Sequence, residues 1–248
     1  MSFFIKKILL FAVFLIIAPG FVNKQLEDKG VQADVKNLLQ KKPKGIVISL
    51  GRSCGVARKS KKYGLREYSF PFDWIITPFE DLCAIIQNDF EDFFNFEVFT
   101  RWVEEKQLIN KRYHLYFPHE PINMEDWVES PQGLISSSKI AVEDYHKTKE
   151  KYERRIARFY AVLNSGLRVY LVREDITTMQ TIELYNLLKT KFPEANFTLI
   201  GIEKSFKEGN WSINEANLKY FPVEPDERES PPGAASKRVI KKLSADLK

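Results

Sequence analysis

One cysteine stands where the sequence could build a reactive thiol. Residues 46–60 read IVISLGRSCGVARKS, in which an apolar run ends at Gly51 and Cys54 precedes a basic segment compatible with a helix. A cysteine at the start of a helix meets unpaired backbone N–H groups, and nearby arginine and lysine side chains add positive charge. Both features stabilise a thiolate and indicate a nucleophile, although an inert cysteine in a turn would have the same surroundings.

A thiol nucleophile needs a base, and the chain offers three histidines. His146 lies in a highly charged stretch, which predicts a solvated side chain. His114 falls in the middle of a predicted strand. His119 follows that strand beside Pro118 and Glu120, where a side chain can point into a cleft. We expect His119 to be the base and keep His114 as the alternative.

Two charged residues are candidates for the same site. Asp73 is a lone acid within the aromatic segment SFPFDWI, so its carboxylate must find a partner or solvent. It either orients the histidine or bonds the backbone of its own loop. Arg173 ends the predicted strand RVYLVR and either binds an anionic group of a substrate or pairs with a nearby acid.

The spacing of apolar residues predicts an α/β fold with a partly parallel sheet flanked by helices. Strands that alternate with helices along a chain favour this layered arrangement. The predicted strands cover residues 45–50, 111–118, 168–173 and 196–203, and the predicted helices cover residues 53–63, 78–88, 89–97, 140–164 and 178–191.

Functional residues of such sheets collect at the carboxyl ends of the strands. The end of the first strand carries Ser49, Gly51, Ser53 and Cys54, and the end of a later strand carries Arg173. Ser53 is also placed to cap the helix that follows. We therefore expect Ser49, Gly51, Ser53 and Arg173 to bind the substrate close to Cys54.

The N-terminal segment has the layout of an export signal. Lys6 and Lys7 precede an uninterrupted apolar run over residues 8–18, and a proline and a glycine follow. The run is short for a transmembrane helix, which needs about 20 residues. We expect residues 1–20 to be a signal peptide cleaved before Phe21, with an uncleaved membrane anchor or a buried helix as the alternatives.

The rest of the chain has the composition of one folded domain over residues 45–248, preceded by a polar linker at residues 21–44. Of its 248 residues, 44% are hydrophobic and 13% aromatic, enough for a substantial core. The lysine-rich segments predict solvated faces rather than a nucleic-acid groove. Contact with a membrane is expected only through residues 1–20. No cofactor or metal site is expected, because the glycine-rich fingerprints, C-x-x-C and H-E-x-x-H are all missing.

The chain has two cysteines, Cys54 and Cys83. In an exported protein the simplest arrangement would be a disulfide between them. Cys83, however, shares the helical spacing of an apolar stripe with Phe79, Leu82 and Ile86, whereas Cys54 lies in a turn flanked by glycines. These different environments favour two free thiols and leave the disulfide as the alternative.

Several segments, taken together, match the pattern of a known domain family. They are ISLGRSC, GLREYSFPFDWIITP, NDFEDFF, YFPHEP and the long helix leading into RVYLVRED, over about residues 45–203. In these segments the sequence resembles a domain family described as "putative papain-like cysteine peptidases", and the pairing of S-L-G-x-x-C with F-D-W is the most specific part. The resemblance implies that Cys54 and His119 are the catalytic pair and that Asp73 is the acid of F-D-W. The chain departs from the family after residue 203, where it lacks the usual Trp-rich acidic segment.

These observations predict a thiol-dependent hydrolase or acyltransferase, most simply a peptidase, that acts on a peptide or other acyl substrate outside the cytoplasm. Cys54 would attack a carbonyl, His119 would carry the proton, and Asp73 would orient the imidazole. The alternative is a non-catalytic or glycan-handling binding protein at the cell surface, in which Arg173, Asp73 and aromatic side chains line a cleft. The rate at which Cys54 reacts with an alkylating reagent distinguishes the two.

Overall fold

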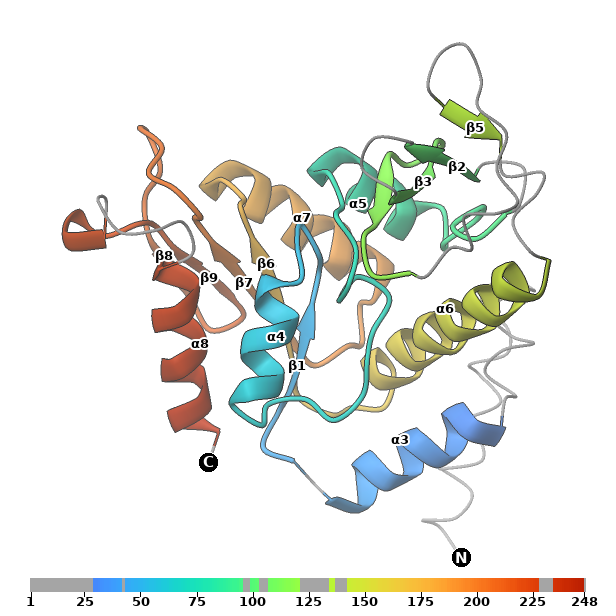
Figure 1. Cartoon of the computed structure of the whole chain (residues 1–248). Coiled ribbons are helices and arrows are strands. Elements are labelled where there is room, and N and C mark those ends of the chain that lie inside the picture. Colours follow the sequence, from blue (N-terminus) through green and yellow to red (C-terminus); the bar gives the residue numbers. More distant parts are fainter. Residues whose placement is uncertain are drawn as a thin grey trace, which may run out of the picture.

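A mostly parallel five-stranded sheet forms the centre of the protein (Figure 1). The computed structural model describes residues 29–41, 43–95, 99–102, 107–120, 134–136, 142–227 and 234–247. The sheet has the strand order β1 (Ile46–Ser49), β6 (Val169–Glu174), β7 (Phe197–Ile202), β9 (Leu218–Phe221) and β8 (Ile213–Asn214), and only β8 runs antiparallel to its neighbour. The predicted α/β fold, with a partly parallel sheet flanked by helices, is confirmed.

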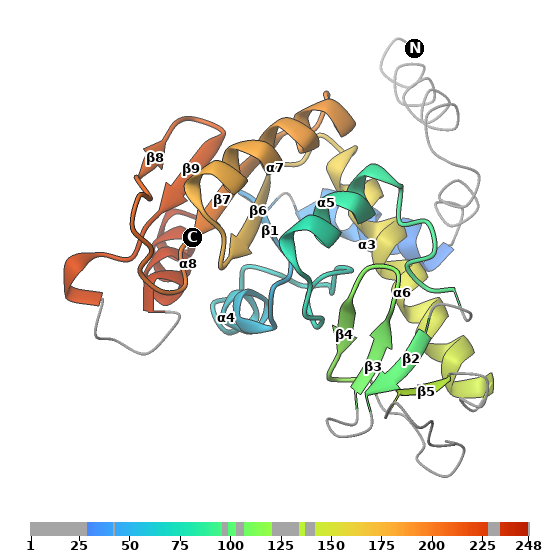
Figure 2. The ribbon, with the colours of Figure 1, turned by 90° about the horizontal axis from the view of Figure 1, so that it is seen from above.

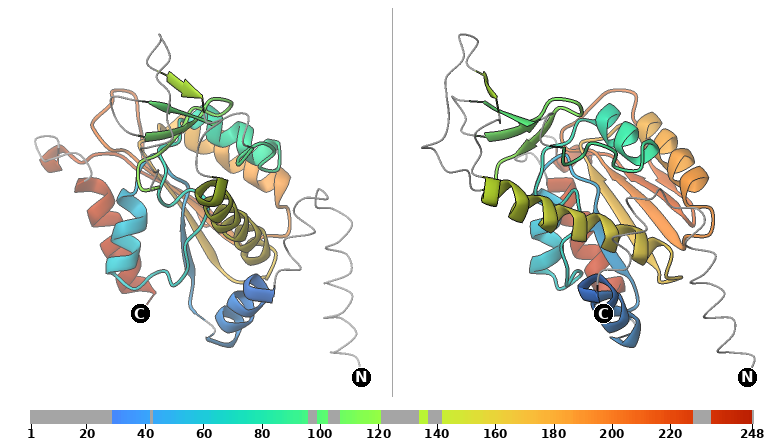
Figure 3. Two further views of the ribbon diagram at one scale, coloured as in Figure 1. Left: turned by 45° about the vertical axis from the view of Figure 1, so that its right-hand side comes forward. Right: turned by 90° about the vertical axis from the view of Figure 1, so that its right-hand side faces the viewer.

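Helices cover both faces of this sheet (Figures 2 and 3). One face carries α4 (Gly55–Lys62) and α8 (Ala234–Asp246), and the other carries α5 (Phe79–Gln87), α6 (Val142–Leu163) and α7 (Thr178–Lys191). Alternate residues of β1 supply the two cores: Val47 packs with α4 and α8, while Ile46 and Ile48 pack with the opposite helices. Burial on both faces explains why the parallel strands are apolar throughout.

A second, antiparallel sheet lies beside α6 (Figure 2). A β-bridge between Ile76 and Tyr116 joins this sheet to the loop that precedes α5, with backbone hydrogen bonds of 2.9 and 3.1 Å. Its strands, in order, are β4 (Leu115–Phe117), β3 (Gln107–Asn110), β2 (Phe99–Trp102) and β5 (Leu134–Ser136). Of these strands the sequence predicted only β4.

The prediction of a strand over residues 111–118 was too long. Residues 111–114 form a turn in which His114 has a φ of +44°, so His114 is not in the middle of a strand. The predicted helix at 89–97 is also wrong in its described part, which consists of turns. The side chains of Asn110 and Tyr113 donate hydrogen bonds to the backbone carbonyls of residues 91–93. In a helix these carbonyls would instead accept hydrogen bonds from the backbone of the next turn.

Part of the expected polar linker is a helix. Helix α3 (Lys29–Lys41) buries Val31 and Leu38, and Arg158 of α6 donates hydrogen bonds of 2.5 and 3.0 Å to Asp34. The helix was not predicted, because the segment is mostly polar and only a few of its apolar residues are buried. The predicted signal segment at residues 1–20 lies outside the described residues, and within the described ranges no helix is long and apolar enough to cross a membrane.

Candidate functional site

Cys54 stands at the beginning of α4, just beyond the carboxyl end of β1. Between them, Gly51 (φ +81°) and Arg52 (φ +71°) both adopt the left-handed backbone conformation, which turns the chain sharply. Cys54 is the N-cap residue of α4, and its carbonyl accepts a 2.9 Å hydrogen bond from the N–H of Arg58. The Cys54 thiol is free and half-buried. The predicted strand, turn and helix around Cys54 are therefore present.

A buried arginine on the neighbouring strand β6 holds this turn by hydrogen bonds. Arg173 on β6 is 1% exposed, and its guanidinium donates to the carbonyl oxygens of Leu50 (2.8 Å) and Thr77 (2.7 Å). A methyl group on Gly51 would lie 2.9 Å from Thr77 Oγ1, so only glycine fits there. Burial, together with the nearby charge of Arg52, lowers the pKa of Arg173 to about 10. Arg173, predicted to bind substrate, thus joins the backbone just before the turn to the backbone of the loop that precedes α5.

The two serines of the predicted site also bond to the turn. Ser49 is buried, and its hydroxyl accepts a 3.2 Å hydrogen bond from the N–H of Gly51. The Ser53 hydroxyl accepts a 3.2 Å hydrogen bond from the N–H of Gly55, the first residue of α4. The structure therefore brings Ser49, Gly51, Ser53 and Arg173 together around the segment that ends in Cys54.

Glu174, the last residue of β6, places a buried carboxylate beneath the start of α4. Ser236 of α8 donates a 2.6 Å hydrogen bond to Glu174 Oε1, and Lys59 Nζ lies 3.4 Å from the same oxygen. Lys59 also contacts Ser236. A carboxylate is stabilised at a helix N-terminus by the helix dipole. This cluster could not be predicted from the sequence, because Ser236 lies in the C-terminal segment, where no motif was found.

Asp175 links the turn before Cys54 to the loop after β7. Its Oδ2 accepts a 2.6 Å hydrogen bond from Arg52 Nε, and its Oδ1 lies 3.5 Å from Lys207 Nζ. Burial acts to raise the pKa of Asp175, but the Arg52 hydrogen bond and the charges of Arg52, Lys207 and Lys204 lower it below the ordinary value. The carboxylate thus holds two cationic segments together at the carboxyl end of the sheet.

Asp73 is fully buried in the aromatic loop. Its Oδ2 accepts a 2.6 Å hydrogen bond from the N–H of Phe70 and lies 2.8 Å from Arg66. The sequence analysis left open whether Asp73 orients the histidine or bonds the backbone of its own loop, and the hydrogen bond to the loop backbone is present. Burial raises the pKa of Asp73 to about 6 against the opposing charge of Arg66. Its second oxygen, Oδ1, has no hydrogen-bond partner within the described part of the chain.

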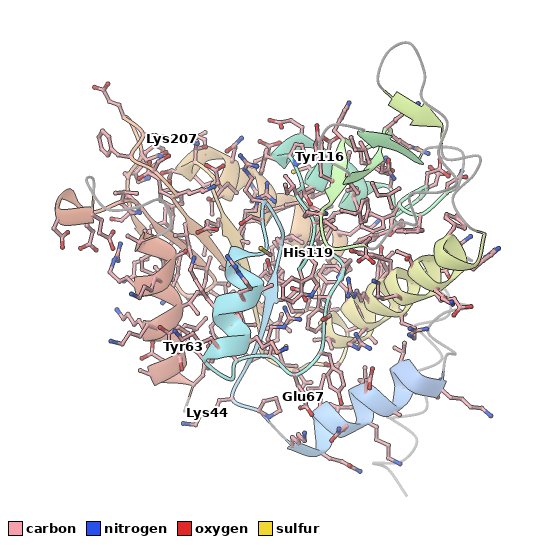
Figure 4. The ribbon with its side chains drawn as sticks, in the orientation of Figure 1. Lys44, Tyr63, Glu67, Tyr116, His119 and Lys207 are labelled. Carbon is pink, nitrogen blue, oxygen red and sulfur yellow. The ribbon has the colours of Figure 1, made fainter. Side chains whose placement is uncertain are left out.

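His119 lies on the exposed turn that follows β4. Its ring meets the ring of Trp74 edge-on, with 5.7 Å between centroids, and the Arg66 guanidinium lies 5.7 Å from the same indole centroid. In the view of Figure 4, His119 lies between α4 and the second sheet. No hydrogen bond or ion pair among the described residues joins His119 to Cys54 or Asp73. The contact with Trp74 nevertheless places it against the F-D-W loop.

The two other histidines are also exposed. His114 Nδ1 lies 3.3 Å from both carboxylate oxygens of Asp81 on α5, which differs from its predicted place within a strand. His146 packs its ring edge-on against Tyr145 at the beginning of α6, in agreement with a solvated side chain.

Cys83 has the core-facing environment that its spacing predicted. It is half-buried on α5 and packs against the main hydrophobic core. Burial, with a smaller effect of the Glu183 charge, raises the pKa of the Cys83 thiol to about 12. Both cysteines are free in the structure, so the alternative of a disulfide between Cys54 and Cys83 is not realised.

Comparison with known proteins places these residues in a family. The family described as "Putative papain-like cysteine peptidase" matches residues 45–199, more than half of the chain. The protein belongs to this family. It is also 28% identical over 201 residues to an uncharacterised protein of Acanthamoeba polyphaga mimivirus, over 71% of this chain and 85% of that relative. No solved structure matches. The family match includes Cys54, Asp73, His119 and Arg173 but ends before Ser236.

Replacing Arg173 by methionine should destabilise the protein. The Arg173→Met variant leaves the buried carbonyls of Leu50 and Thr77 without donors, which costs about 1–3 kcal/mol in the free energy of unfolding. Urea unfolding measures the loss. Arg154→Met is the matched control, since Arg154 is exposed on α6 and its ion pair with Glu150 (3.9 Å) is also exposed, so stability should change by no more than about 0.5 kcal/mol. Equal losses in the two variants would contradict the tethering role.

The raised pKa of Asp73 predicts a pH-dependent stability. Because the folded protein binds this proton more tightly than the unfolded chain, the contribution of Asp73 to stability should fall as pH rises from about 4 to about 6, by up to about 3 kcal/mol. The difference in unfolding free energy between wild type and Asp73→Asn, measured in urea at several pH values, should decrease over this window. Asp175→Asn is the control, since the lowered pKa of Asp175 predicts the opposite sign. A difference for Asp73→Asn that does not vary with pH would refute the assignment.

Proposed function

We propose that the protein is a thiol-dependent hydrolase, most simply a peptidase, in which Cys54 is the nucleophile. The observation that carries the proposal is the position of Cys54, a half-buried free thiol at the N-terminus of α4 and at the carboxyl end of a parallel strand. Backbone N–H groups of the first turn of a helix can stabilise the negative charge that develops on a carbonyl oxygen next to such a thiol. Membership of the peptidase-like family supports the same reading.

In the proposed reaction, Cys54 Sγ attacks the carbonyl carbon of the substrate while His119 accepts the thiol proton. N–H groups of the first turn of α4 stabilise the resulting oxyanion. His119 then donates its proton to the leaving amine as the C–N bond breaks, which leaves a thioester on Cys54. Water attacks the thioester, with His119 again accepting a proton, and the acid product and the free thiol are regenerated.

Among the three histidines, the contacts favour His119 as the base. His114 lies next to a carboxylate on α5, and His146 lies on α6. His119 is exposed, and Trp74 restricts the orientation of its ring. Asp73 acts on His119 indirectly in this proposal, because its carboxylate holds Arg66, and Arg66 in turn lies over Trp74.

The strand-end residues serve the proposed reaction by holding the nucleophile rigidly. The hydroxyls of Ser49 and Ser53 accept hydrogen bonds from backbone N–H groups in and after the turn. Arg173 donates to the carbonyl of Leu50 just before the turn and to that of Thr77 in the loop before α5. A nucleophile fixed in this way needs little reorganisation when the substrate binds. Gly51 contributes by letting the chain turn closely against Thr77, where a side chain would not fit.

Iodoacetamide should label Cys54 at least about tenfold faster than Cys83 in the folded protein, because Cys54 has a helix-terminal setting and Cys83 is partly buried with a raised pKa. Mass spectrometry of labelled peptides measures both rates. Cys54→Ala should abolish hydrolysis of any peptide that the wild type cleaves, whereas Cys83→Ala is the matched control and should retain cleavage.

The opposite result would support the alternative function. If Cys54 reacts no faster than a thiol in the unfolded chain, a non-catalytic or glycan-handling binding protein becomes the better account. If Cys54→Ala cleaves at the wild-type rate, Cys54 is not the nucleophile. His119→Gln separates the two further, since it should slow cleavage without weakening the binding of a substrate.

We also propose that the protein acts outside the cytoplasm, on the basis of the basic and apolar residues of its first 20 positions. N-terminal sequencing of the protein purified from its own cells should then find Phe21 as the first residue. A Lys6→Glu, Lys7→Glu double variant should be exported less efficiently. Recovery of the intact N-terminus in the cytoplasmic fraction would refute export.

A further inference from the structure

One side chain of α6 contacts both ends of the turn that carries His119. The turn runs over residues 117–120, and the N–H of Glu120 donates a 3.3 Å hydrogen bond to the carbonyl of Phe117. The ring of Phe117 meets the ring of Tyr152 edge-on, with 5.3 Å between centroids, and the Tyr152 hydroxyl donates a 3.0 Å hydrogen bond to Glu120 Oε1. The exposed His119 therefore lies between two residues that are both held by Tyr152.

Glu120, the residue after His119, has a buried carboxylate with both oxygens bound to α6. The residue is only 8% exposed, and its Oε2 forms an ion pair with Lys151, the neighbour of Tyr152. Taking a carboxylate out of water is costly unless hydrogen bonds or an opposite charge compensate for it. Glu120 therefore cannot move towards solvent without breaking both contacts, and His119 would move with it.

Tyr152 is itself fixed in the core. Its side chain is fully buried, its ring stacks on the ring of Phe94 at 5.3 Å between centroids, and the Arg155 guanidinium lies 4.7 Å from its centroid. Burial and the charge of Glu120 raise the pKa of Tyr152 well above its usual range, so the hydroxyl keeps its proton and remains a donor. Tyr152 is thus a rigid anchor for the turn.

Two different elements therefore restrict His119. Helix α6 holds the backbone of its turn through Tyr152, and the aromatic loop restricts its ring through Trp74, at 5.7 Å between centroids. In Figure 4, His119 lies between the second sheet and α4, the helix that follows Cys54. A misplacement of about 1 Å can slow a reaction by about a hundredfold, so groups that fix this turn matter to proton transfer without meeting the substrate.

We propose that Glu120 and Tyr152 are positioning residues for His119, which hold its turn where the imidazole can exchange a proton with the Cys54 thiol. The inference rests on the proposed function, in which Cys54 is the nucleophile and His119 the base. Glu120 and Tyr152 are both buried, so they act through the turn and not on the substrate. Lys151 assists by pairing with the Glu120 carboxylate.

Histidine NMR measures the position of His119 in the full chain. Isotope-labelled histidine gives a Cε1–H signal for each of the three histidines, and His119→Gln identifies the signal of His119. Tyr152→Phe keeps the packed ring and removes only the hydroxyl, whereas Glu120→Ala removes the carboxylate. Both should move the His119 signal towards that of a solvated histidine, because its ring moves away from Trp74. Glu120→Gln keeps an oxygen that accepts from Tyr152 and should restore a signal close to that of the wild type.

Alkylation by iodoacetamide shows whether this position matters to the Cys54 thiol. An unassisted thiol is only a few per cent ionised at pH 7, so a base in place can raise its rate there by up to about thirtyfold. Tyr152→Phe and Glu120→Ala should lower the rate of Cys54 at pH 7 at least about threefold, in the direction of His119→Gln. At about pH 10 the rate should match the wild type, because a thiol ionises there without a base. A general loss of folded protein would change the rate at both pH values.

Tyr160→Phe is the matched control. Tyr160 is also buried on α6, and its hydroxyl donates a 2.8 Å hydrogen bond to the carboxylate of Asp89, which is not next to a histidine. This variant should leave both the His119 signal and the rate of Cys54 at pH 7 as they are in the wild type. An effect as large as that of Tyr152→Phe would point to a general loosening of α6 and would overturn the inference.

The test separates failure of this inference from failure of the proposed function. If His119→Gln slows Cys54 at pH 7 but Tyr152→Phe and Glu120→Ala do not, the proposed function stands and the positioning role is refuted. Equal slowing of Cys54 at both pH values refutes the positioning role as well. If His119→Gln leaves the rate at pH 7 unchanged, His119 is not the base, and the NMR signal alone then decides whether Tyr152 and Glu120 hold its turn.

Discussion

The candidate site depends on one buried cation. The Arg173 guanidinium joins the end of β1 to the loop before α5, because it donates to the carbonyls of Leu50 and Thr77 at once. A buried charge is costly, and the lowered pKa of Arg173 reflects that cost. The hydrogen bonds to carbonyls offset part of it. Arg173 therefore anchors two segments to the parallel sheet, the turn at Gly51 and the loop that pairs with the second sheet through Ile76 and Tyr116. The group that positions Cys54 thus also positions the second sheet.

Three consecutive residues at and just beyond the end of β6 support the segment around Cys54 from three directions, because side chains alternate along a strand. Arg173 points to the side of α5 and holds the turn. Glu174 points to the opposite side, where Lys59 and Ser236 meet its carboxylate beneath α4. Asp175, just beyond the strand, holds Arg52. The C-terminal helix α8 lies outside the family match but completes the second of these supports, so the site of this chain includes a part that the family pattern does not define.

The sequence predicted correctly those helix and strand bounds that depend on interactions between residues close together in the chain. Helix α7 begins and ends where predicted, and a capping box of Thr177 and Gln180 fixes its start. The turns at residues 88–94 and 111–114 escaped prediction, because Asn110 and Tyr113 satisfy carbonyls about 20 residues away. In the site, the strand–turn–helix around Cys54 was predictable. The partners of Arg173 and Glu174 were not, since they lie 62 to 123 residues away and no pattern connects them.

Cys54 and His119, the proposed catalytic pair, differ in how many contacts hold them in place. Cys54 follows a turn fixed by buried groups on β1 and β6, so it moves only if the parallel sheet is disturbed. His119 lies on an exposed turn of the second sheet, where the ring of Trp74 is its described contact. Local opening takes least free energy where few groups are buried, so the position of His119 should respond first to changes in the F-D-W loop. That loop contains Asp73, whose pKa of about 6 lies within the range of mildly acidic surroundings. Loss or gain of one proton on Asp73 changes the charge next to Arg66, whose guanidinium lies over Trp74, the ring that His119 contacts. We therefore expect the position of His119 to depend on pH more than that of Cys54.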